Sequence, residues 1–325
     1  MAKKEMDKIL VTGAVGQIGS ELTMALREKY GNDNVVACGH KTKPGEKLKN
    51  SGPFDFLDVT KKEEIEDIVD EYDIDTIYNM SAILSGVGEK KPLLCWKVNM
   101  DGLHNILEVA REKDLTRIFV PSSIAVFGPE TPKKNTPQDT VLKPTTMYGV
   151  TKVSGELLGD YYFKKFGIDI RGVRYPGIIS SETLPGGGTT DYAVEIFYDA
   201  IKDKEYECFV EKETQLPMMY MPDCINAAID LMETDVDNLK HHCDFNVTSM
   251  SFSAGEIAEE IKKHIPEFEC KYKPDFRQEI ADSWPNDLDD SAARDEWGWD
   301  PQYDLSSMVE DMLDKLKKRY EKEEL

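Results

Sequence analysis

The most constraining feature of the sequence is a turn near its N-terminus that carries three regularly spaced glycines. Residues 12–19 read Thr-Gly-Ala-Val-Gly-Gln-Ile-Gly, between an apolar run at Lys8–Thr12 and an amphipathic stretch at Gln17–Tyr30. Glycines at a strand-to-helix junction permit a tight turn and a close backbone approach to a pyrophosphate. The helix N-terminus offers unpaired N–H groups to the phosphates. At the first junction of an alternating series, this pattern predicts a dinucleotide site rather than a plain turn.

The first 128 residues alternate short apolar runs with amphipathic stretches. We expect strands at Lys8–Thr12, Asn34–Cys38, Phe54–Leu57, Asp75–Met80 and Arg117–Pro121, and helices at Gln17–Tyr30, Glu63–Glu71 and Lys97–Glu112. Such alternation is typical of a parallel sheet with helices on both faces. The predicted fold class is α/β, a doubly wound Rossmann-type parallel sheet with a smaller mixed α/β substrate-binding domain.

The second half of the chain is less regular. Its expected elements are a helix at Tyr148–Phe166, one strand at Ile168–Tyr175, a glycine-rich stretch at Pro185–Thr190, a helix at Asp191–Ile201, an apolar turn at Met218–Met221, a helix at Asp223–Met232 and a strand at Asp244–Val247. We predict that residues 1–179 and 221–249 form the dinucleotide-binding domain, and that residues 180–220 and 250–325 form the substrate-binding domain. The charged run at 317–324 is expected as a solvated helix end.

Charge and cysteine content argue against several classes of partner. The chain has 62 acidic and 40 basic residues, and the net charge of −22 disfavours nucleic acid and anionic membranes. No apolar run approaches the ~18 residues of a membrane span, and the charged N-terminus does not resemble a secretory signal. The six cysteines form no CxxC pair and no histidine stands at metal spacing, so we expect no metal and reduced thiols in a cytoplasmic protein.

Tyr148 and Lys152 stand four residues apart, on one face of the predicted helix. A free tyrosine titrates near pH ~10, and a neighbouring lysine cation favours its phenolate form. Alone, this spacing is a frequent accident, and an exposed helical pair is the simpler interpretation. However, Ser122 and Ser123 follow the fifth strand, where such sheets carry catalytic groups. No Gly-x-Ser-x-Gly segment surrounds either serine, which argues against a serine hydrolase.

The glycine turn, the serine after the fifth strand and Tyr-x-x-x-Lys, in that order, resemble the extended short-chain dehydrogenase/reductases, the NAD-dependent epimerase/dehydratase family. Further segments resemble the short-chain L-threonine 3-dehydrogenases, namely residues 121–129, 144–149, 185–194, 218–223, 283–285, 289–291 and 297–299. The resemblance implies oxidation of the β-hydroxyl of L-threonine to L-2-amino-3-oxobutanoate, a step of threonine catabolism. It implies Tyr148 as the base, Lys152 as the group that stabilises its phenolate, and Ser123 as a hydrogen-bond donor to the developing alkoxide.

The same resemblance implies NAD as the cofactor. The implied cofactor-binding residues are Gly13, Gly16, Gln17, Ile18, Gly19, Asp58, Val59, Ser81, Ala82, Asn99, Ser122, Tyr148, Lys152, Tyr175, Pro176 and Ile178. The acidic residue that usually binds the adenosine ribose is absent, because Gly39 stands there, followed by His40 and Lys41, with Lys43 close by. Either these basic residues accommodate a 2′-phosphate, which would favour NADP, or backbone and water hold the ribose and the lysines are solvated.

An amino-acid substrate needs partners for its carboxylate and its ammonium group. The candidates are Ser85, Ser123, Tyr148, Gly187, Gly188, Thr189, Thr190 and Trp284, with Ser85 the first choice for the carboxylate. The glycine run predicts either a lid that closes over the substrate or a flexible surface turn. Trp284 suits the core as readily as the site.

Two other functions stay open. A nucleotide-sugar 4-epimerase or dehydratase shares these residues, although the second half lacks a basic cluster for a diphosphate. A non-catalytic NAD(P)-binding regulator is a further alternative, although such proteins commonly lose the tyrosine or the lysine. The resemblance also implies a homodimer formed by the Tyr–Lys helix and the helix before it. The apolar candidates for that interface, each equally suited to the core, are Trp96, Leu103, Leu107, Leu157 and Leu158.

Overall fold

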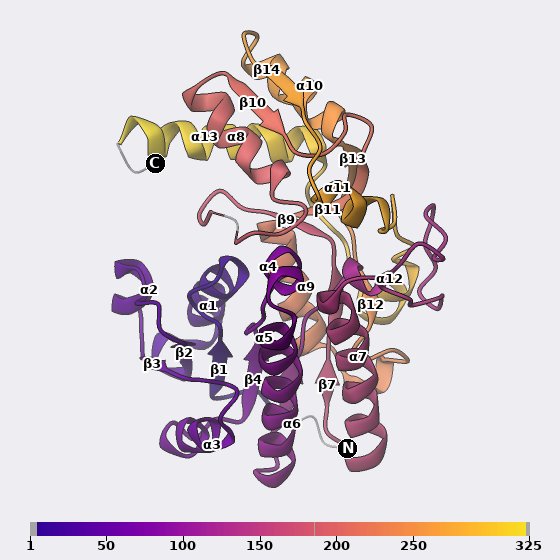
Figure 1. The fold of residues 1–325 in the computed structure, drawn as a ribbon. Coiled ribbons are helices and arrows are strands. Elements are labelled where there is room, and N and C mark those ends of the chain that lie inside the picture. The colour runs from indigo at the N-terminus through magenta and orange to yellow at the C-terminus, as the bar shows by residue number, and fades with distance from the viewer. Residues whose placement is uncertain (1–4, 185, 323–325) are drawn as a thin grey trace.

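The computed structural model describes residues 5–184 and 186–322; Pro185 of the glycine-rich stretch and the end of the charged C-terminal run lie outside the described residues. A six-stranded parallel sheet occupies the lower part of the molecule in Figure 1, with the order β3-β2-β1-β4-β5-β7. Its strands are β1 (Ile9–Thr12), β2 (Val35–Gly39), β3 (Phe54–Phe56), β4 (Thr76–Asn79), β5 (Arg117–Phe119) and β7 (Ile170–Arg171). The strand order reverses between β1 and β4, the position at which such sheets bind ligands.

Helices cover both faces of this sheet. They are α1 (Gln17–Tyr30), α2 (Glu46–Asn50), α3 (Lys62–Glu71), α4 (Ser85–Lys90), α5 (Pro92–Trp96), α6 (Gly102–Glu112), α7 (Met147–Phe166) and α9 (Met221–Glu233), with short 3-10 or π turns at Asn32–Asn34, Lys97–Asp101, Ile124–Val126 and Val236–Asn238. Alternate residues of a strand point to opposite faces. Ile9 and Val11 therefore pack with α1 and α9, whereas Leu10 packs with α3, α6 and α7. The predicted doubly wound parallel sheet is confirmed.

One expected strand is divided in two. The run at Ile168–Tyr175 forms β7 and then β8 (Val173–Tyr175), so the prediction of a single strand is wrong. The break lies at Gly172, where a Cβ would come within 2.2 Å of the Val120 oxygen, because the neighbouring chain passes against the backbone. Beyond the break, β8 pairs in parallel with β6 (Ser122–Ser123) and with β12 (Phe245–Asn246).

The expected apolar turn at Met218–Met221 is also wrong. Its first three residues end β11 (Gln215–Tyr220), and Met221 begins α9. β11 is the middle strand of a separate sheet, between β9 (Gly177–Ile179) and β13 (Met250–Ser253). Because β11 is buried on both faces, its sequence has no alternation of apolar and polar residues from which a strand is predicted.

The upper part of the molecule surrounds a second core. Its further elements are β10 (Glu205–Cys208), β14 (Glu269–Tyr272), α8 (Tyr192–Lys202), α10 (Ala254–His264), α11 (Arg277–Asp282) and α13 (Leu305–Glu321). Between α11 and α13 the chain crosses back, and α12 (Ser291–Trp297) packs beside β12. Trp297 and Trp299 join the core that α1 shares with α9. The C-terminal quarter therefore contributes to both cores.

Candidate functional site

A cleft of about 1060 Å³, counting space open to solvent, lies where the main sheet meets the smaller sheet. The carboxyl ends of parallel strands meet at one edge, so the segments after β1, β4 and β5 come together there. The structure gathers most of the predicted residues along this cleft: Gly13, Gly16, Gln17, Ile18, Gly19, Ala82, Ser85, Ser122, Ser123, Tyr148, Lys152, Tyr175, Pro176, Ile178, Gly188, Thr189, Thr190 and Trp284.

The turn between β1 and α1 forms one wall of the cleft. Gly13 has a positive φ of 64°, and a Cβ on it would lie 2.7 Å from the Met80 backbone. A Cβ on Gly19 would lie 2.3 Å from the Gly13 oxygen. Only glycine meets both the backbone angle and the close approach. The packing of this turn therefore requires glycine at positions 13 and 19.

The start of α1 fits an anionic group. No side chain caps the helix at Gly16, and its first turn contains no acidic residue. Helix N-termini attract negative charge through their free N–H groups. The Gln17 Nε2 is buried and has no hydrogen-bond partner within residues 5–184 and 186–322. A buried donor without a partner is costly, so the site fits a group with phosphate oxygens, such as a dinucleotide.

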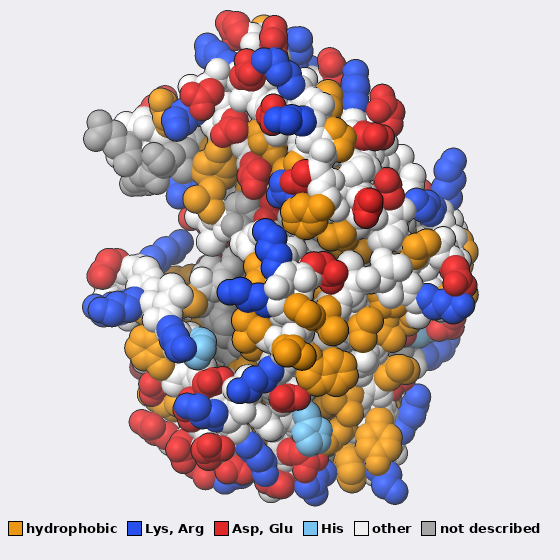
Figure 2. Space-filling model, viewed as in Figure 1, with side chains coloured by type: hydrophobic (Ala, Val, Ile, Leu, Met, Phe, Trp, Pro, Cys, Tyr) orange, Lys and Arg blue, Asp and Glu red, His pale blue; other side chains and the backbone are white. Residues whose placement is uncertain are grey.

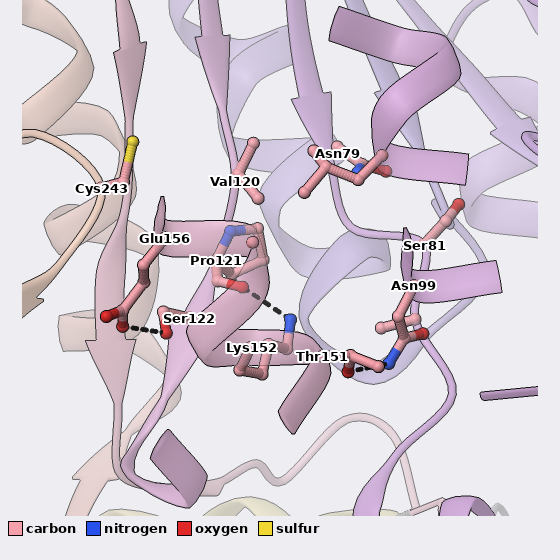
Figure 3. Close-up of a pocket in the computed structure, with 13 residues that line it drawn as sticks. Asn79, Ser81, Asn99, Val120, Pro121, Ser122, Thr151, Lys152, Glu156 and Cys243 are labelled. Atoms are coloured by element: carbon pink, nitrogen blue, oxygen red, sulfur yellow. Dashed lines mark hydrogen bonds between the residues drawn. The ribbon is translucent and has the colours of Figure 1, made fainter. Parts of the chain in front are cut away.

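Tyr148 and Lys152 face the cleft from the first turns of α7. The Lys152 Nζ donates to the Pro121 carbonyl at 2.6 Å (Figure 3) and lies 5.4 Å from the centre of the Tyr148 ring. Burial raises the pKa of Tyr148 to about 12, against an opposing hydrogen bond with Ser123. Burial also lowers the pKa of Lys152 to about 8. At neutral pH the tyrosine is therefore a phenol and the lysine is mostly a cation.

The two serines of β6 make different contacts. The Ser122 Oγ donates to the Glu156 carboxylate at 2.5 Å. The Ser123 Oγ accepts from a backbone N–H two residues on at 3.2 Å, and it also contacts Tyr148. Ser123 therefore lies beside Tyr148, as the resemblance implies for a group that contacts the substrate oxygen, whereas Ser122 is bound to Glu156 further along α7.

A smaller cavity lies beside Lys152 (Figure 3) and is lined by two further predicted cofactor residues, Ser81 and Asn99, together with Ala82. The Asn99 side chain accepts from the Ile83 N–H at 2.8 Å and donates to the Ile83 carbonyl at 3.1 Å. These two bonds fix the segment that follows β4. In this structure Asn99 therefore shapes the wall of the site through Ile83.

The side of the cleft predicted to bind substrate is built by α4 and by the stretch before α8. Ser85 and Thr189 are both buried, and their hydroxyl oxygens lie 3.3 Å apart. The buried Trp284 Nε1 has no hydrogen-bond partner in the described part of the chain. Of the predicted substrate residues, Gly187 does not line the cleft, whereas Gly188 next to it does.

Comparison with known proteins agrees with this geometry. The family described as NAD dependent epimerase/dehydratase matches residues 9–248. This chain belongs to that family. A Staphylococcus haemolyticus protein described as an uncharacterized epimerase/dehydratase is 51% identical over 315 residues, covering 97% of this chain and 99% of its own length. The predicted family membership is confirmed.

Solved structures within the family are similar along nearly the whole chain. An L-threonine dehydrogenase from Clostridium difficile is 54% identical with a TM-score of 0.95, covering 97% of this chain and 99% of its own. A monomeric L-threonine 3-dehydrogenase from a metagenome is 50% identical with a TM-score of 0.92, covering 95% and 99%. The likeness therefore includes the smaller sheet and the C-terminal helices as well as the dinucleotide-binding part.

Among the cleft residues that the sequence analysis did not predict, Asp191 is the charged one in this epimerase/dehydratase family member. Asp191 is the one acidic side chain among the described residues that line the cleft. Its Oδ2 accepts from the N–H groups of Gly187 at 2.8 Å and Gly188 at 2.6 Å. Burial raises its pKa to about 6. The sequence analysis placed Asp191 only at the start of the predicted helix Asp191–Ile201, and helical spacing gives no sign of its place in the cleft.

Two predicted residues of this family member, Asp58 and Val59, line neither cavity. Asp58 accepts hydrogen bonds from Thr60 and lies 3.6 Å from the exposed His40 ring. A Cβ on Gly39 would meet three neighbours at 3.2–3.3 Å. Glycine at position 39 is therefore closely packed against its neighbours.

No helix within the described ranges is both long and apolar enough to cross a membrane. Within the same ranges, no group of three or more His, Cys, Asp or Glu side chains is arranged to hold a metal ion. The six cysteines are free thiols, and five of them are buried.

Proposed function

We propose that this protein is an NAD-dependent L-threonine 3-dehydrogenase, which oxidises the β-hydroxyl of L-threonine to L-2-amino-3-oxobutanoate. The observation that carries the proposal is the cleft in which Tyr148, Lys152 and Ser123 lie beside the glycine turn. Two similar structures are described as L-threonine dehydrogenases. When bound, NAD supplies the nicotinamide ring that accepts the hydride.

In the proposed mechanism, Tyr148 takes the proton of the substrate hydroxyl. A phenol with a pKa of about 12 is a poor base at neutral pH, so the nearby cation of Lys152 is needed to stabilise its phenolate form. Ser123 donates a hydrogen bond to the substrate oxygen as negative charge develops there. The hydroxyl of Ser123 therefore acts electrostatically and forms no covalent bond.

The upper wall of the cleft supplies groups for the two charges of an amino acid. We assign the hydroxyls of Ser85, Thr189 and Thr190 to the substrate carboxylate, and the Asp191 carboxylate to the ammonium group. The indole N–H of Trp284 is a further donor. The proposal includes the predicted division into a cofactor domain of residues 1–179 and 221–249 and a substrate domain of residues 180–220 and 250–325.

NAD is the proposed cofactor in preference to NADP. A 2′-phosphate near the end of β2 would need His40, Lys41 or Lys43 as a partner. His40 already has the Asp58 carboxylate 3.6 Å away, and that anion would repel a phosphate. Comparing the affinity of the protein for the two cofactors tests this choice. Tighter binding of NADP would overturn it.

We also propose a homodimer that forms through α5 and α7. Hydrophobic side chains gather over these helices in Figure 2, and the most exposed are Leu93 at 86% and Leu157 at 65%. Such a patch is typical of an interaction surface. Leu103 and Leu107 are buried in the core and are not part of it. Sedimentation of the protein and of Leu157→Glu tests the assembly; a wild-type monomer would overturn it.

The first experiment is to incubate the protein with L-threonine and NAD and to follow the absorbance of reduced nicotinamide. L-Serine, D-threonine and L-allo-threonine serve as controls for the substrate. We expect reduction that depends on L-threonine. Protein that binds NAD but does not oxidise L-threonine would overturn the proposal and would favour a nucleotide-sugar epimerase or a non-catalytic regulator.

A further inference from the structure

A buried carboxylate lies one helical turn beyond Lys152. Tyr148, Lys152 and Glu156 are spaced by four residues along α7 and so share one face of the helix. Glu156 is 7% exposed and lines the smaller cavity with Lys152 (Figure 3). A buried carboxylate with no compensating partners would be strongly destabilising, so its contacts decide what it does.

The Glu156 carboxylate links α7 to two strands. It accepts from the Ser122 hydroxyl of β6 at 2.5 Å, and from the Nε and Nη2 of Arg174 of β8 at 2.9 Å each. The Nη1 of Arg174 donates to the Gln138 carbonyl at 2.9 Å and to the Asn246 side chain at 3.1 Å. A two-pronged arginine–carboxylate contact fixes orientation as well as distance.

The pairing of β6 with β8 explains how the contacts of Glu156 affect Ser123. Ser122 is the register partner of Arg174, and Ser123 is the register partner of Tyr175. Glu156 therefore binds one register pair on the face toward α7. Ser123, the next residue of β6, contacts Tyr148 on the same helix.

We propose that Glu156 is a positioning residue for the dehydrogenase reaction: it holds β6 and β8 against α7, and so fixes Ser123 relative to Tyr148 and Lys152. The inference rests on the proposed function. It concerns a side chain that does not line the main cleft and acts through Ser122 and Arg174.

The charge of Glu156 has a second effect that can be measured, which is on the pKa of Lys152. The charged or titratable groups that act on Lys152 are Glu156 on its own helix and the Cys95 thiol on α5, and both oppose the lowering of its pKa by burial. Those that act on Glu156 are Arg174 and Asp244. Removing the charge of Glu156 therefore lowers the pKa of Lys152, whereas removing only the Ser122 hydroxyl leaves it unchanged.

The test compares Glu156→Gln, which keeps the shape but loses the charge, with Ser122→Ala, which loses one hydrogen bond. We expect Glu156→Gln to lower kcat about tenfold or more with NAD affinity nearly unchanged. Labelling lysines with acetic anhydride over a range of pH, read by mass spectrometry, gives the pKa of Lys152 without turnover. We expect that pKa to fall in Glu156→Gln only, and kcat to fall in both variants.

Asp169→Asn is the matched control. Asp169 accepts from Arg117 and Arg171 at 2.7 Å each, in a comparable ion pair just before β7, away from the cleft. We expect it to lose thermal stability as Glu156→Gln does while kcat stays within about twofold. Unchanged kcat in Glu156→Gln, or equal loss of kcat in Asp169→Asn, would overturn the inference.

The proposed function and the proposed role of Glu156 can be overturned independently of each other. If the wild type does not oxidise L-threonine, the proposed function fails, and the pKa of Lys152 in Glu156→Gln still tests the coupling: an unchanged value overturns it. Should Glu156→Gln not fold, Glu156→Asp, which keeps the charge with a shorter reach, takes its place. In that variant we expect a lower kcat with the pKa of Lys152 unchanged, and an unaltered kcat would overturn the inference.

Discussion

The two glycine-rich segments that border the cleft differ in what holds them. In the turn after β1, a Cβ on Gly13 or Gly19 would meet backbone atoms at 2.7 or 2.3 Å. In the loop before α8, the nearest described atom to a Cβ on Gly186 would be a Leu84 methyl at 3.6 Å, and the nearest to one on Gly188 would be an Asp191 carboxylate oxygen. One close backbone approach occurs there as well, since a Cβ on Gly86 would lie 2.6 Å from the Gly187 oxygen. The cofactor wall is therefore fixed by contact of backbone with backbone, whereas the substrate wall depends largely on hydrogen bonds to one carboxylate.

This difference matches what each wall has to do. A dinucleotide presents the same pyrophosphate in every enzyme of this kind, so a rigid turn suits it. A loop held by side-chain hydrogen bonds opens and closes at lower cost and admits a small substrate. Mutations should therefore have different effects on the two walls, and those effects can be measured.

The largest expected effect comes from the side chain that acts between the walls. Tyr148→Phe removes the base and should lower kcat by ~10²–10⁴-fold. Neither wall changes, so the affinities for NAD and L-threonine should stay close to those of the wild type. Steady-state kinetics and a direct binding measurement check this. Activity within about tenfold of the wild type would remove Tyr148 from the mechanism.

The variants Gly13→Ala and Gly186→Ala compare the two walls directly, because each adds one methyl group to one of the glycine-rich segments. The first forces a side chain onto a positive φ and into the Met80 backbone, so we expect a loss of more than ~2 kcal/mol in the free energy of unfolding and much weaker NAD binding. The second should stay within about 0.5 kcal/mol. Chemical denaturation and NAD titration measure both, and equal losses would refute the distinction.

Asp191→Asn tests the hydrogen bonds of the substrate wall. The variant loses the charge that we assign to the substrate ammonium group, so KM for L-threonine should rise about tenfold or more while NAD affinity is unchanged. Because burial raises the pKa of Asp191 to about 6, lowering the pH through 6 protonates it. In the wild type, KM should therefore rise below about pH 6, and this pH dependence should be absent in Asp191→Asn.

The smallest expected effect is that of Ser85→Ala. The variant removes one neutral hydroxyl, which lies 3.3 Å from that of Thr189, and a bond of that kind is worth about 0.5–1.5 kcal/mol. KM for L-threonine should rise a few-fold with kcat nearly unchanged. Ser154→Ala, which removes an exposed hydroxyl on α7, is the control. An equal KM for L-threonine in both variants would show that the Ser85 hydroxyl does not contribute to substrate binding.

Features set by neighbouring residues were predictable from the sequence. The glycine turn and the Tyr148–Lys152 spacing each depend on a few consecutive residues, and the structure brings both to one cleft. Features set by distant contacts were not. Glu156 matters because β6 and β8 meet it, and β11 was not predicted because it is buried along nearly its whole length as the middle strand between β9 and β13. Gly172 divides a strand because Val120 passes beside it.

The return of the C-terminal segment to the first core determines when this protein can fold in the cell. The core shared by α1 and α9 is completed by Trp297 and Trp299, near the end of a chain of 325 residues. At ~5–20 residues per second, those tryptophans leave the ribosome tens of seconds after β1 does. Until then the first core lacks both tryptophans, so it is completed only after residue 299 has been synthesised.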